Sequence, residues 1–447
     1  MSAADNRVTG RGDSRPAVSV AIPIVAGIIC ALVGYTSSFA VVLAGLRGVG
    51  ASPVQAASGL LAVTVCMALA SIVLSYRFRI PITSAWSTPG AALLAATGAV
   101  AGGWPAAVGA FLITGVLFVV TGLWSGLSSL IGRIPVPVAQ AMLAGVLLPL
   151  CIAPATSLAH HPAAVAPVLL TWLVLVKAAP RWAVPGAFLA AMIVIAITAS
   201  TGDVHLSASE LIPRLEFVAP SWGWQALVGI AIPLYVVTMA AQNIPGVAVM
   251  KTFDYEVPWR PSMLVTGLGT VLGAVAGGHA INLAAISAAL AAGPDAGPDR
   301  SRRWIAAVSA GVSYLVIAPL SAALSALVLA AGEGVLEAVA GVALLGAFAG
   351  AISGAFADPH TRTAAGITFV IAASGVSLLG IGSAFWALLI GIIAFVILRP
   401  DSDVGIRLRR LVGPLVGRGE VGRADVGVGG HPVEDTTTPD QRGGTQQ

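Results

Sequence analysis

The stretch GGHAINLAAISAALAAG, residues 277–293, places a histidine and an asparagine directly before a ten-residue run of mostly small apolar residues. Ten helical residues extend about 15 Å, half of the roughly 30 Å thickness of a bilayer's hydrocarbon core. Gly293-Pro294 after the run is typical of a helix end. We therefore predict a broken membrane element, in which GGHAI is extended, Asn282 is the N-cap and the run is a half-helix.

The same plan occurs a second time, in RIPITSAWSTPGAALLAATG at residues 79–98. The ITSAW part favours an extended chain, Ser87 or Thr88 is a good N-cap, and Pro89 suits the first helical position. The helical part stops at Gly98. Non-helical backbone at membrane depth is tolerated only where it is buried in protein or lines a cavity. We therefore expect both half-helices to begin near the midplane and to face one cavity.

The rest of the chain has the composition of a membrane protein. Of its 447 residues, 57% are hydrophobic and 9% are charged, which leaves too few polar groups to cover a water-soluble surface. Apolar runs long enough to span a bilayer recur from Ala17 to Leu398. The composition predicts an all-α polytopic membrane protein embedded in a lipid bilayer. The basic residues lie in short loops, so the net charge of +4 indicates no nucleic-acid partner.

Polar segments divide the chain. Residues 1–16 lack the apolar region of a signal peptide and are predicted to be a cytoplasmic tail. Residues 399–447 are rich in Gly, Arg, Asp and Thr and are predicted to be a disordered cytoplasmic tail. Residues 201–221 are predicted to form a periplasmic connection between two repeats, 17–200 and 222–398.

We predict fourteen apolar elements, seven in each repeat. Their ranges are 17–45, 53–75, 81–99, 103–124, 135–153, 162–178, 182–200, 222–246, 258–276, 279–293, 304–330, 334–356, 362–377 and 381–398. With the N-terminus in the cytoplasm, only Arg47 and Arg214 of the 23 lysine and arginine residues fall on the outer side. Because seven is odd, the second repeat is inverted relative to the first, as in many secondary transporters.

The two half-helix starts are predicted to bind an anion. A helix N-terminus offers free N–H groups and a partial positive charge, so two of them need no buried lysine or arginine. The predicted contacts are Thr88 to Gly90 in the third element and Asn282, Leu283 and Ala284 in the tenth. Every Asp and Glu lies in a tail, a loop or the end of a span. The alternative is that both breaks serve helix packing alone.

His279 is the one histidine inside the predicted spans. An ionisable side chain within a membrane is a functional hypothesis by default, and histidine titrates near neutral pH. His279 is therefore a candidate for donating to a carboxylate and for carrying a coupling proton. The alternative is a histidine hydrogen-bonded to backbone at the membrane boundary.

Gln242 and Asn243 are adjacent amides in the eighth element, and unpaired amides are costly in lipid. At least one is predicted to contact substrate; the alternative is hydrogen bonding between helices. In the first element, GYTSSF at 34–39 offers Tyr35 and three hydroxyl groups to the same cavity, although small hydroxyls are also common in helix packing. Trp86 is a candidate for stacking on an aromatic substrate or for anchoring at the interface.

With these motifs the chain resembles the benzoate:proton symporter family. The resemblance covers about residues 17–398. The stretches that carry it are PITSAWSTPGAALLA (81–95), AAQNIPGVAVMK (240–251), GGHAINLAAISAAL (277–290), GPDAGPDRSRRW (293–304) and SGVSLLGIGSAFWALLIG (374–391).

The resemblance implies a multi-pass importer of benzoate or a related aromatic acid in a bacterial inner membrane. It also implies the uracil-permease-like fold, in which a core of elements 1–4 and 8–11 moves against a gate of elements 5–7 and 12–14, and a homodimer through the gate. Nucleobase transporters of that fold carry carboxylates where this chain has Gln242 with Asn243 and Asn282 with Ala284. The replacement of carboxylates by uncharged residues fits an anionic substrate. It also leaves His279 as the leading candidate for carrying the coupling proton.

Two other functions are weighed against proton-coupled benzoate uptake. One is a transporter or exchanger of inorganic or other organic anions on the same fold. The other is a membrane enzyme, which the sequence disfavours because it has no paired carboxylates at the midplane and no nucleophile with a base. Cys30, Cys66 and Cys151 all lie in apolar runs and show no zinc-site spacing with histidine, so neither a metal nor a cofactor is predicted.

Overall fold

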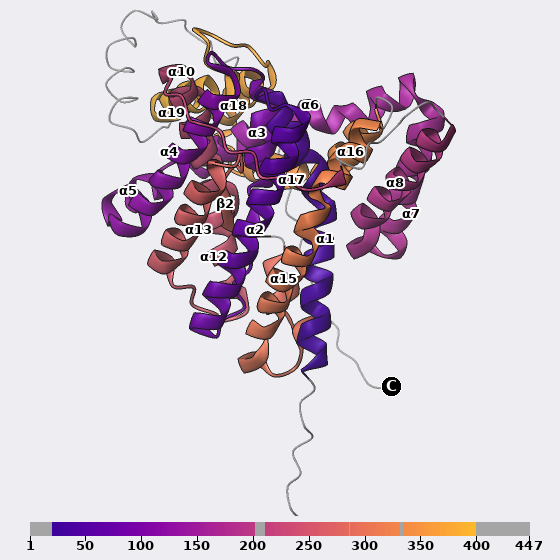
Figure 1. Ribbon diagram of the computed structural model, residues 1–447. Helices are drawn as coiled ribbons and strands as arrows, with labels where there is room; N and C mark the ends of the chain where they lie inside the picture. Colours follow the sequence, from indigo (N-terminus) through magenta and orange to yellow (C-terminus); the bar gives the residue numbers. More distant parts are fainter. Residues whose placement is uncertain (1–19, 202–210, 286, 331–333, 399–447) are drawn as a thin grey trace, which may run out of the picture.

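The computed structural model describes residues 20–201, 211–285, 287–330 and 334–398. The predicted tails lie outside the described residues, as does the first part of the predicted periplasmic connection. The described chain is almost entirely helical, and two short strands lie near its centre (Figure 1). Eight of its helical runs are long and apolar enough to cross a membrane. These features support the predicted all-α polytopic class.

The elements follow one another along the chain in two groups. The first group is α1 (Ala21–Gly48), α2 (Pro53–Phe78), β1 (Ser84–Trp86), α3 (Thr88–Thr97), α4 (Gly103–Leu123), α5 (Ser125–Gly132), α6 (Val136–His160), α7 (Pro162–Ala178), η1 (Pro180–Trp182) and α8 (Ala183–Thr201). The second group is α10 (Trp224–Ala226), η2 (Leu227–Ala231), α11 (Ile232–Thr238), η3 (Met239–Asn243), α12 (Ile244–Thr252), α13 (Trp259–Ala274), β2 (Ile281–Leu283), α14 (Ala288–Ala292), η4 (Pro294–Ala296), η5 (Arg300–Arg302), α15 (Trp304–Ile317), η6 (Ala318–Leu320), α16 (Ser321–Ala330), α17 (Val335–Phe356), α18 (Arg362–Ala373) and α19 (Ser383–Leu398).

Several predicted bounds differ from the observed ones. The fifth element was predicted to stop at residue 153, but α6 continues to His160 with Pro149 and Pro154 inside it. Proline is tolerated in membrane helices because neighbouring groups satisfy the backbone that it frees. The short helix α5 was not predicted, since its serine- and glycine-rich sequence carries a weak apolar signal.

The two strands are antiparallel neighbours, although they are far apart in the sequence. Ala85 pairs with Asn282, and Trp86 pairs with Ile281. Side chains of the surrounding helices complete the backbone hydrogen bonds of this pair. Ser84 N–H donates to Ser71 Oγ of α2 at 2.8 Å, and Ile281 N–H donates to Thr270 Oγ1 of α13 at 3.1 Å. Such partners are needed because a sheet edge open to lipid leaves costly unpaired groups.

Close helix packing holds the two strand-bearing segments in place. Gly45 of α1 lies against the Ala91 carbonyl of α3, where a Cβ would collide with it. Gly59 of α2 lies in the same way against the Gly277 carbonyl, which precedes β2. Small residues let membrane helices approach this closely. Helix α1 is thereby packed tightly against α3, and α2 against the segment before β2.

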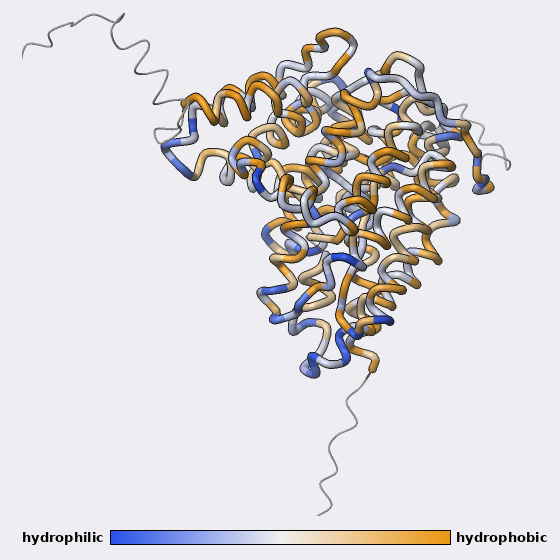
Figure 2. Tube along the Cα trace, turned by 90° about the vertical axis from the view of Figure 1, so that its left-hand side faces the viewer, coloured by the Kyte–Doolittle hydropathy of each residue, from blue (hydrophilic) through white to orange (hydrophobic). Residues whose placement is uncertain are grey.

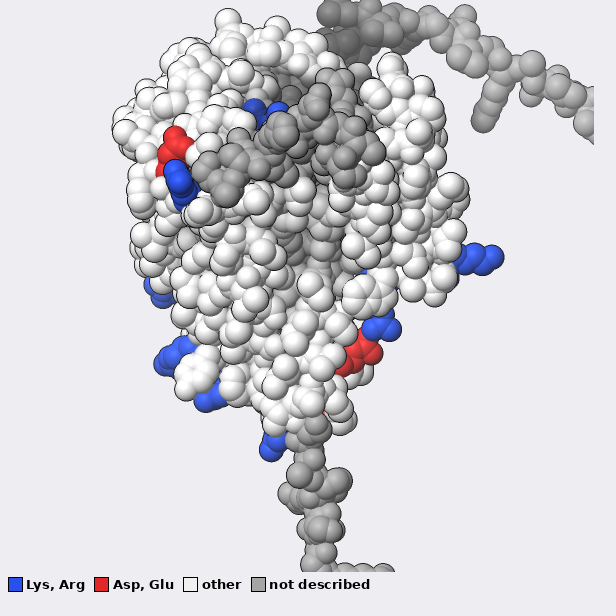
Figure 3. Space-filling model, turned by 45° about the vertical axis from the view of Figure 1, so that its right-hand side comes forward, with Lys and Arg blue, Asp and Glu red and all other residues white. Residues whose placement is uncertain are grey.

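Hydrophobic residues cover most of the helices, and hydrophilic ones are concentrated at turns and helix ends (Figure 2). Many lysine and arginine side chains gather toward the lower end of the face in Figure 3. The end of the molecule at which α1 begins and α2 ends is called the basic end below. Arg79 lies there with its guanidinium 4.0 Å from the ring of Trp304, and Gly297 lies beside Ile22. This grouping is what the positive-inside rule expects of one membrane side.

Candidate functional site

A cavity of about 60 Å³ lies beside the two strands, and we call it the central cavity. It is bounded by α1, β1, the first residue of α3, η3, and the chain from β2 into α14. Its lining residues are Val33, Gly34, Ser37, Ser38, Ala85, Trp86, Thr88, Gln242, Ala284, Ala285, Ser287 and Leu290. None of these described residues is charged. The cavity therefore combines neutral hydrogen-bonding groups with apolar walls.

The N-terminus of α3 reaches the central cavity through Thr88. Ser87 is the N-cap: its Oγ accepts from the Gly90 N–H at 3.1 Å. Pro89 occupies the second helical position, one residue later than predicted. Thr88 Oγ1 donates to Ser38 Oγ of α1 at 2.9 Å. The positive end of a ten-residue helix therefore lies beside the cavity.

The prediction that Asn282 caps a ten-residue half-helix is wrong. Asn282 lies inside β2, and its Nδ2 donates to the Leu283 carbonyl at 2.7 Å. The Ala284 N–H donates to the Thr83 carbonyl at 2.9 Å, so strand pairing keeps the chain extended beyond Asn282. The helix α14 begins only at Ala288 and has five residues. The tenth segment thus meets the cavity with extended chain, and not with a helix N-terminus at Asn282.

The two adjacent amides have different surroundings. Gln242 lines the central cavity and is 8% exposed, and its side-chain amide makes no hydrogen bond to another described residue. Asn243 is fully buried behind it: its Oδ1 accepts from the Leu283 N–H at 2.9 Å, and its Nδ2 contacts Met239 Sδ at 3.3 Å. Both belong to η3, a π-helical segment, and such segments are frequent at functional sites. Gln242 is therefore free to bind a ligand, while Asn243 holds β2.

His279 is 1% exposed and does not line the central cavity. Its Nε2 lies 3.2 Å from the Ser87 carbonyl, the same oxygen that accepts the Ala91 N–H. A carbonyl only accepts, so Nε2 carries a proton. Nδ1 is buried and has no hydrogen-bond partner in the described chain. His279 therefore ties the segment before β2 to the start of α3 and keeps one ring nitrogen available.

Three aromatic side chains in contact with one another lead from α1 to the cavity. Trp86 lines the cavity, and its ring centroid lies 5.1 Å from that of Tyr35. Tyr35 in turn stacks on Phe39 at 5.8 Å. Tyr35 is 2% exposed and is not a lining residue. It supports Trp86 from behind, and Trp86 presents the aromatic surface.

Of the predicted contacts, Trp86, Thr88, Gln242 and Ala284 line the central cavity. The others surround it without lining it: Tyr35, Ser87, Gly90, Asn243, His279, Asn282 and Leu283. Gly90 is packed so tightly that a Cβ would collide with the Leu234 side chain. Six lining residues were missed altogether: Val33, Gly34, Ala85, Ala285, Ser287 and Leu290.

The missed residues of α1 could have been predicted from helical spacing. Val33, Gly34, Ser37 and Ser38 are one and four residues apart and form one helix face. Tyr35 and Thr36 belong to other faces of the same helix. By contrast, the residues missed after β2 depend on where α14 begins, and the sequence alone gave no sign of that late start.

Residues 17–397 match the family model described as benzoate membrane transport protein. The chain belongs to this family. Within the curated proteins, it is 36% identical over 382 residues to the inner membrane protein YdcO of Escherichia coli K12, covering 85% of this chain and 96% of that protein. It is 30% identical over 385 residues to the benzoate membrane transport protein of Acinetobacter baylyi, with the same two coverages of 85% and 96%.

Two solved structures have the same fold as this member of the benzoate membrane transport family. One is the transmembrane domain of the cyanobacterial bicarbonate transporter BicA, with a TM-score of 0.53, 15% identity, and coverage of 84% of this chain and 97% of that one. The other is SLC26A9, with a TM-score of 0.59, 14% identity, and coverage of 85% and 65%. The expected resemblance is confirmed, and the family places the chain among membrane transporters rather than enzymes.

Proposed function

We propose that the protein is a secondary active transporter that carries benzoate or a related aromatic carboxylate into the cytoplasm together with a proton. The family match and the relative from Acinetobacter baylyi, which is itself described as a benzoate membrane transport protein, support this substrate class. The observation that carries the proposal is the central cavity. Its neutral donors and one helix N-terminus suit a carboxylate, and Trp86 suits an aromatic ring.

In this proposal the carboxylate is bound at Thr88 and Gln242. The Gln242 side-chain amide offers two N–H donors that no other described residue uses. The N-terminus of α3 contributes a partial positive charge that costs no buried cation. The ring lies against Trp86 and the aliphatic residues Val33 and Leu290. Asn243, Asn282 and Leu283 act indirectly, because they fix the chain that bounds the cavity.

We propose His279 as the proton carrier. A neutral histidine with hydrogen on Nε2 takes up a proton at Nδ1, and that atom has no partner in the described chain. Its bond to the Ser87 carbonyl links its charge to the N-cap of α3. A positive charge placed there favours an anion at the start of α3. The competing route is uptake of the acid with its own proton.

The transport cycle is proposed to be alternating access between core and gate. The central cavity of about 60 Å³ is far smaller than the roughly 300–1,000 Å³ of sites that enclose drug-sized ligands. An aromatic acid therefore needs the cavity to expand, which relative movement of core and gate provides. The two repeats, 17–200 and 222–398, with β1–α3 and β2–α14 as their matching broken elements, remain part of this proposal, as do cytoplasmic termini in a bacterial inner membrane and a homodimer.

The small volume of the central cavity also favours a second candidate function. As it stands, the cavity has room for a small inorganic anion, and BicA, a fold relative, is described as a bicarbonate transporter. An inorganic-anion transporter or exchanger would use the same helix N-terminus and the same amide. It would have no use for the aromatic surface of Trp86.

Uptake into proteoliposomes separates the two candidates. Radiolabelled benzoate is offered with an inward proton gradient, and unlabelled benzoate, bicarbonate, sulfate, chloride and uracil are tested as competitors. We expect gradient-driven uptake that benzoate blocks and the other four leave unchanged. Uptake that bicarbonate or sulfate blocks as well as benzoate does would establish the inorganic-anion alternative instead.

A further inference from the structure

A second and larger cavity opens at the basic end of the molecule, and we call it the end cavity. Its volume is about 410 Å³, within the range of small-molecule sites. Its walls include Ile22, Val25 and Ile29 of α1, Leu290 of α14, Arg181 of η1 and Asp295 of η4. One side is therefore aliphatic, and the other carries one cation and one carboxylate. The proposed function does not yet use this cavity.

The ionic side of the end cavity is an exposed ion pair. Arg181 Nη1 donates to Asp295 Oδ2 at 2.9 Å, and the two side chains are 63% and 66% exposed. An ion pair this exposed is screened by solvent and contributes little to stability. An arginine binds any carboxylate in the same planar geometry. Arg181 can therefore exchange the Asp295 carboxylate for that of a ligand at little cost.

Leu290 lines both the end cavity and the central cavity. The two cavities are thus adjacent, and the Leu290 side chain forms a wall that they share. A molecule that leaves the central cavity toward the basic end reaches the end cavity next. The walls that it would meet there are aliphatic, as an aromatic ring requires.

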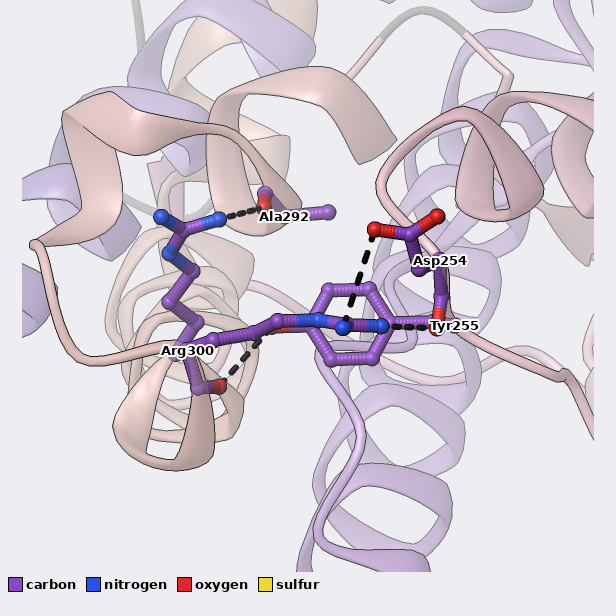
Figure 4. A network of polar contacts seen from close by, with 5 residues as sticks. Asp254, Tyr255, Ala292 and Arg300 are labelled. Carbon is purple, nitrogen blue, oxygen red and sulfur yellow. Dashed lines mark hydrogen bonds and ion pairs between the residues drawn. The ribbon is translucent and has the colours of Figure 1, made fainter.

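Arginine side chains at the basic end hold the segment that follows Leu290. Arg303 Nη1 donates to the Ala292 carbonyl at the end of α14 at 2.7 Å, and its Nε donates to the Gly297 carbonyl at 2.8 Å. Figure 4 shows how the Arg300 side chain crosses over the Tyr255 ring, with its Cζ 4.5 Å from the ring centroid, and pairs with Asp254. The segment that carries Leu290 and Asp295 is therefore tied to the chain that follows α12.

Arg181 comes from a different group of helices. It lies in η1, between α7 and α8, which pack against each other at the right of Figure 1. In the proposed division these two helices belong to the gate, whereas α14 and η4 belong to the core. The Arg181–Asp295 pair thus joins gate to core across the mouth of the end cavity.

We propose that the end cavity is a second binding site for the aromatic carboxylate, between the central cavity and the cytoplasm. The ring lies against α1 and Leu290, and the carboxylate binds Arg181 in place of Asp295. Binding there opens the ion pair between gate and core. This inference rests on the proposed function, which supplies the substrate class and the direction of transport.

Equilibrium binding of radiolabelled benzoate to the purified full-length protein tests the second site. The wild-type protein should bind benzoate in two classes. Arg181→Gln should remove one class, whereas Asp295→Asn should strengthen that class about tenfold, because it removes the carboxylate that competes for Arg181. Lys177→Gln is the matched control: it removes one exposed positive charge from the end of α7, does not touch the end cavity, and should change neither class.

Opposite effects of the two substitutions are the decisive result, because a purely structural ion pair would respond in the same direction to the loss of either partner. Equal effects, or binding in both variants that matches the wild type, would overturn the second site.

Gln242→Ala separates this failure from a failure of the proposed function. If Gln242→Ala weakens one class about tenfold while Arg181→Gln changes nothing, the second site alone is wrong; if the wild-type protein binds no benzoate, both proposals fail. Elution volume and melting temperature verify the folding of each variant.

Discussion

At the scale of single residues, Gln242 and Asn243 show how neighbours in sequence take different roles. The Asn243 amide is occupied by Leu283 and Met239, so its removal would release β2. The Gln242 amide faces the central cavity and is not engaged by any other described residue. Truncating a side chain that is 8% exposed and lacks such a partner costs the protein little stability. The same side chain contributes most to binding, when a ligand occupies the cavity.

Gln242→Ala should therefore weaken benzoate binding about tenfold and leave the melting temperature of the protein nearly unchanged. Gln242→Glu should weaken it further, because a carboxylate at that position repels the anion. Benzoate titration of the purified protein measures both effects.

Gln140 of α6 provides the control, since it is a glutamine in another membrane helix and does not line the central cavity. Gln140→Ala and Gln140→Glu should bind benzoate like the wild type. Equal affinity in the wild type and Gln242→Glu would remove Gln242 from the site.

His279→Gln tests the proton carrier. A glutamine amide still donates to the Ser87 carbonyl, so the hydrogen bond between the segment before β2 and the start of α3 is retained, but the amide does not take up a proton. We expect benzoate binding within a few-fold of the wild type and a loss of benzoate-driven acidification. A pH-sensitive dye inside proteoliposomes reports the acidification.

Protein-free liposomes set the baseline of that measurement, because the neutral form of an aromatic acid crosses lipid unaided. His160→Gln, at the exposed end of α6, serves as the histidine control. Acidification at the wild-type rate in His279→Gln would show that the proton travels on the acid.

At the scale of elements, the third and tenth segments differ in how far the sequence predicts them. In the third, STPG and Gly98 determine the helix ends, and α3 lies within one residue of the predicted bounds. In the tenth, the run after Asn282 has high helix propensity, yet α14 begins six residues after Asn282. Tertiary contacts overrule propensity there, since Thr83 and Asn243 bind the N–H groups of Ala284 and Leu283.

The site is predictable to a similar degree. Trp86, Thr88 and Gln242 were found from local signals: a helix start, an amide in an apolar run and an aromatic residue beside a break. The position of Leu290 depends on the delayed start of α14, and that start depends on pairing with a distant strand. Single-sequence patterns describe local preference, so they miss contacts between distant segments.

The hydrogen bonds from helix side chains to the strand edges should matter for stability. Ser71→Ala removes the acceptor of the Ser84 N–H and leaves it buried without that partner. We expect the free energy of unfolding to fall by about 1–3 kcal/mol. Thermal unfolding in detergent, compared with Ser262→Ala, measures the loss; Ser262 is a fully buried serine of α13 whose hydroxyl has no hydrogen-bond partner in the described chain. An equal or larger effect of Ser262→Ala would mean that the strand edge is not the sensitive contact.

At the scale of the whole molecule, the basic end makes a prediction about orientation. The positive-inside rule puts that end in the cytoplasm and the chain near Arg214 on the opposite side. Single cysteines at Lys177 and Arg214, in a chain whose native cysteines are replaced, should therefore label differently with a membrane-impermeant maleimide. We expect Arg214→Cys to react from the outside while the membrane is intact, and Lys177→Cys to react only after the membrane is permeabilised.

That experiment uses spheroplasts, and the cysteine-free chain is the control for background labelling. Its native cysteines are Cys30, Cys66 and Cys151, all within or near the packed helices. Reaction of both positions from the same side would contradict the predicted arrangement of the spans.

The pairing of β1 with β2 also has a consequence for how the protein is made. Residue 84 emerges from the ribosome long before residue 283, its partner in the finished sheet. Until then the first strand has no neighbour, and lipid offers nothing in its place. Nascent chains that stop before the second strand should therefore wait beside the insertion machinery or be degraded, and the centre of the protein should be among the last parts to assemble.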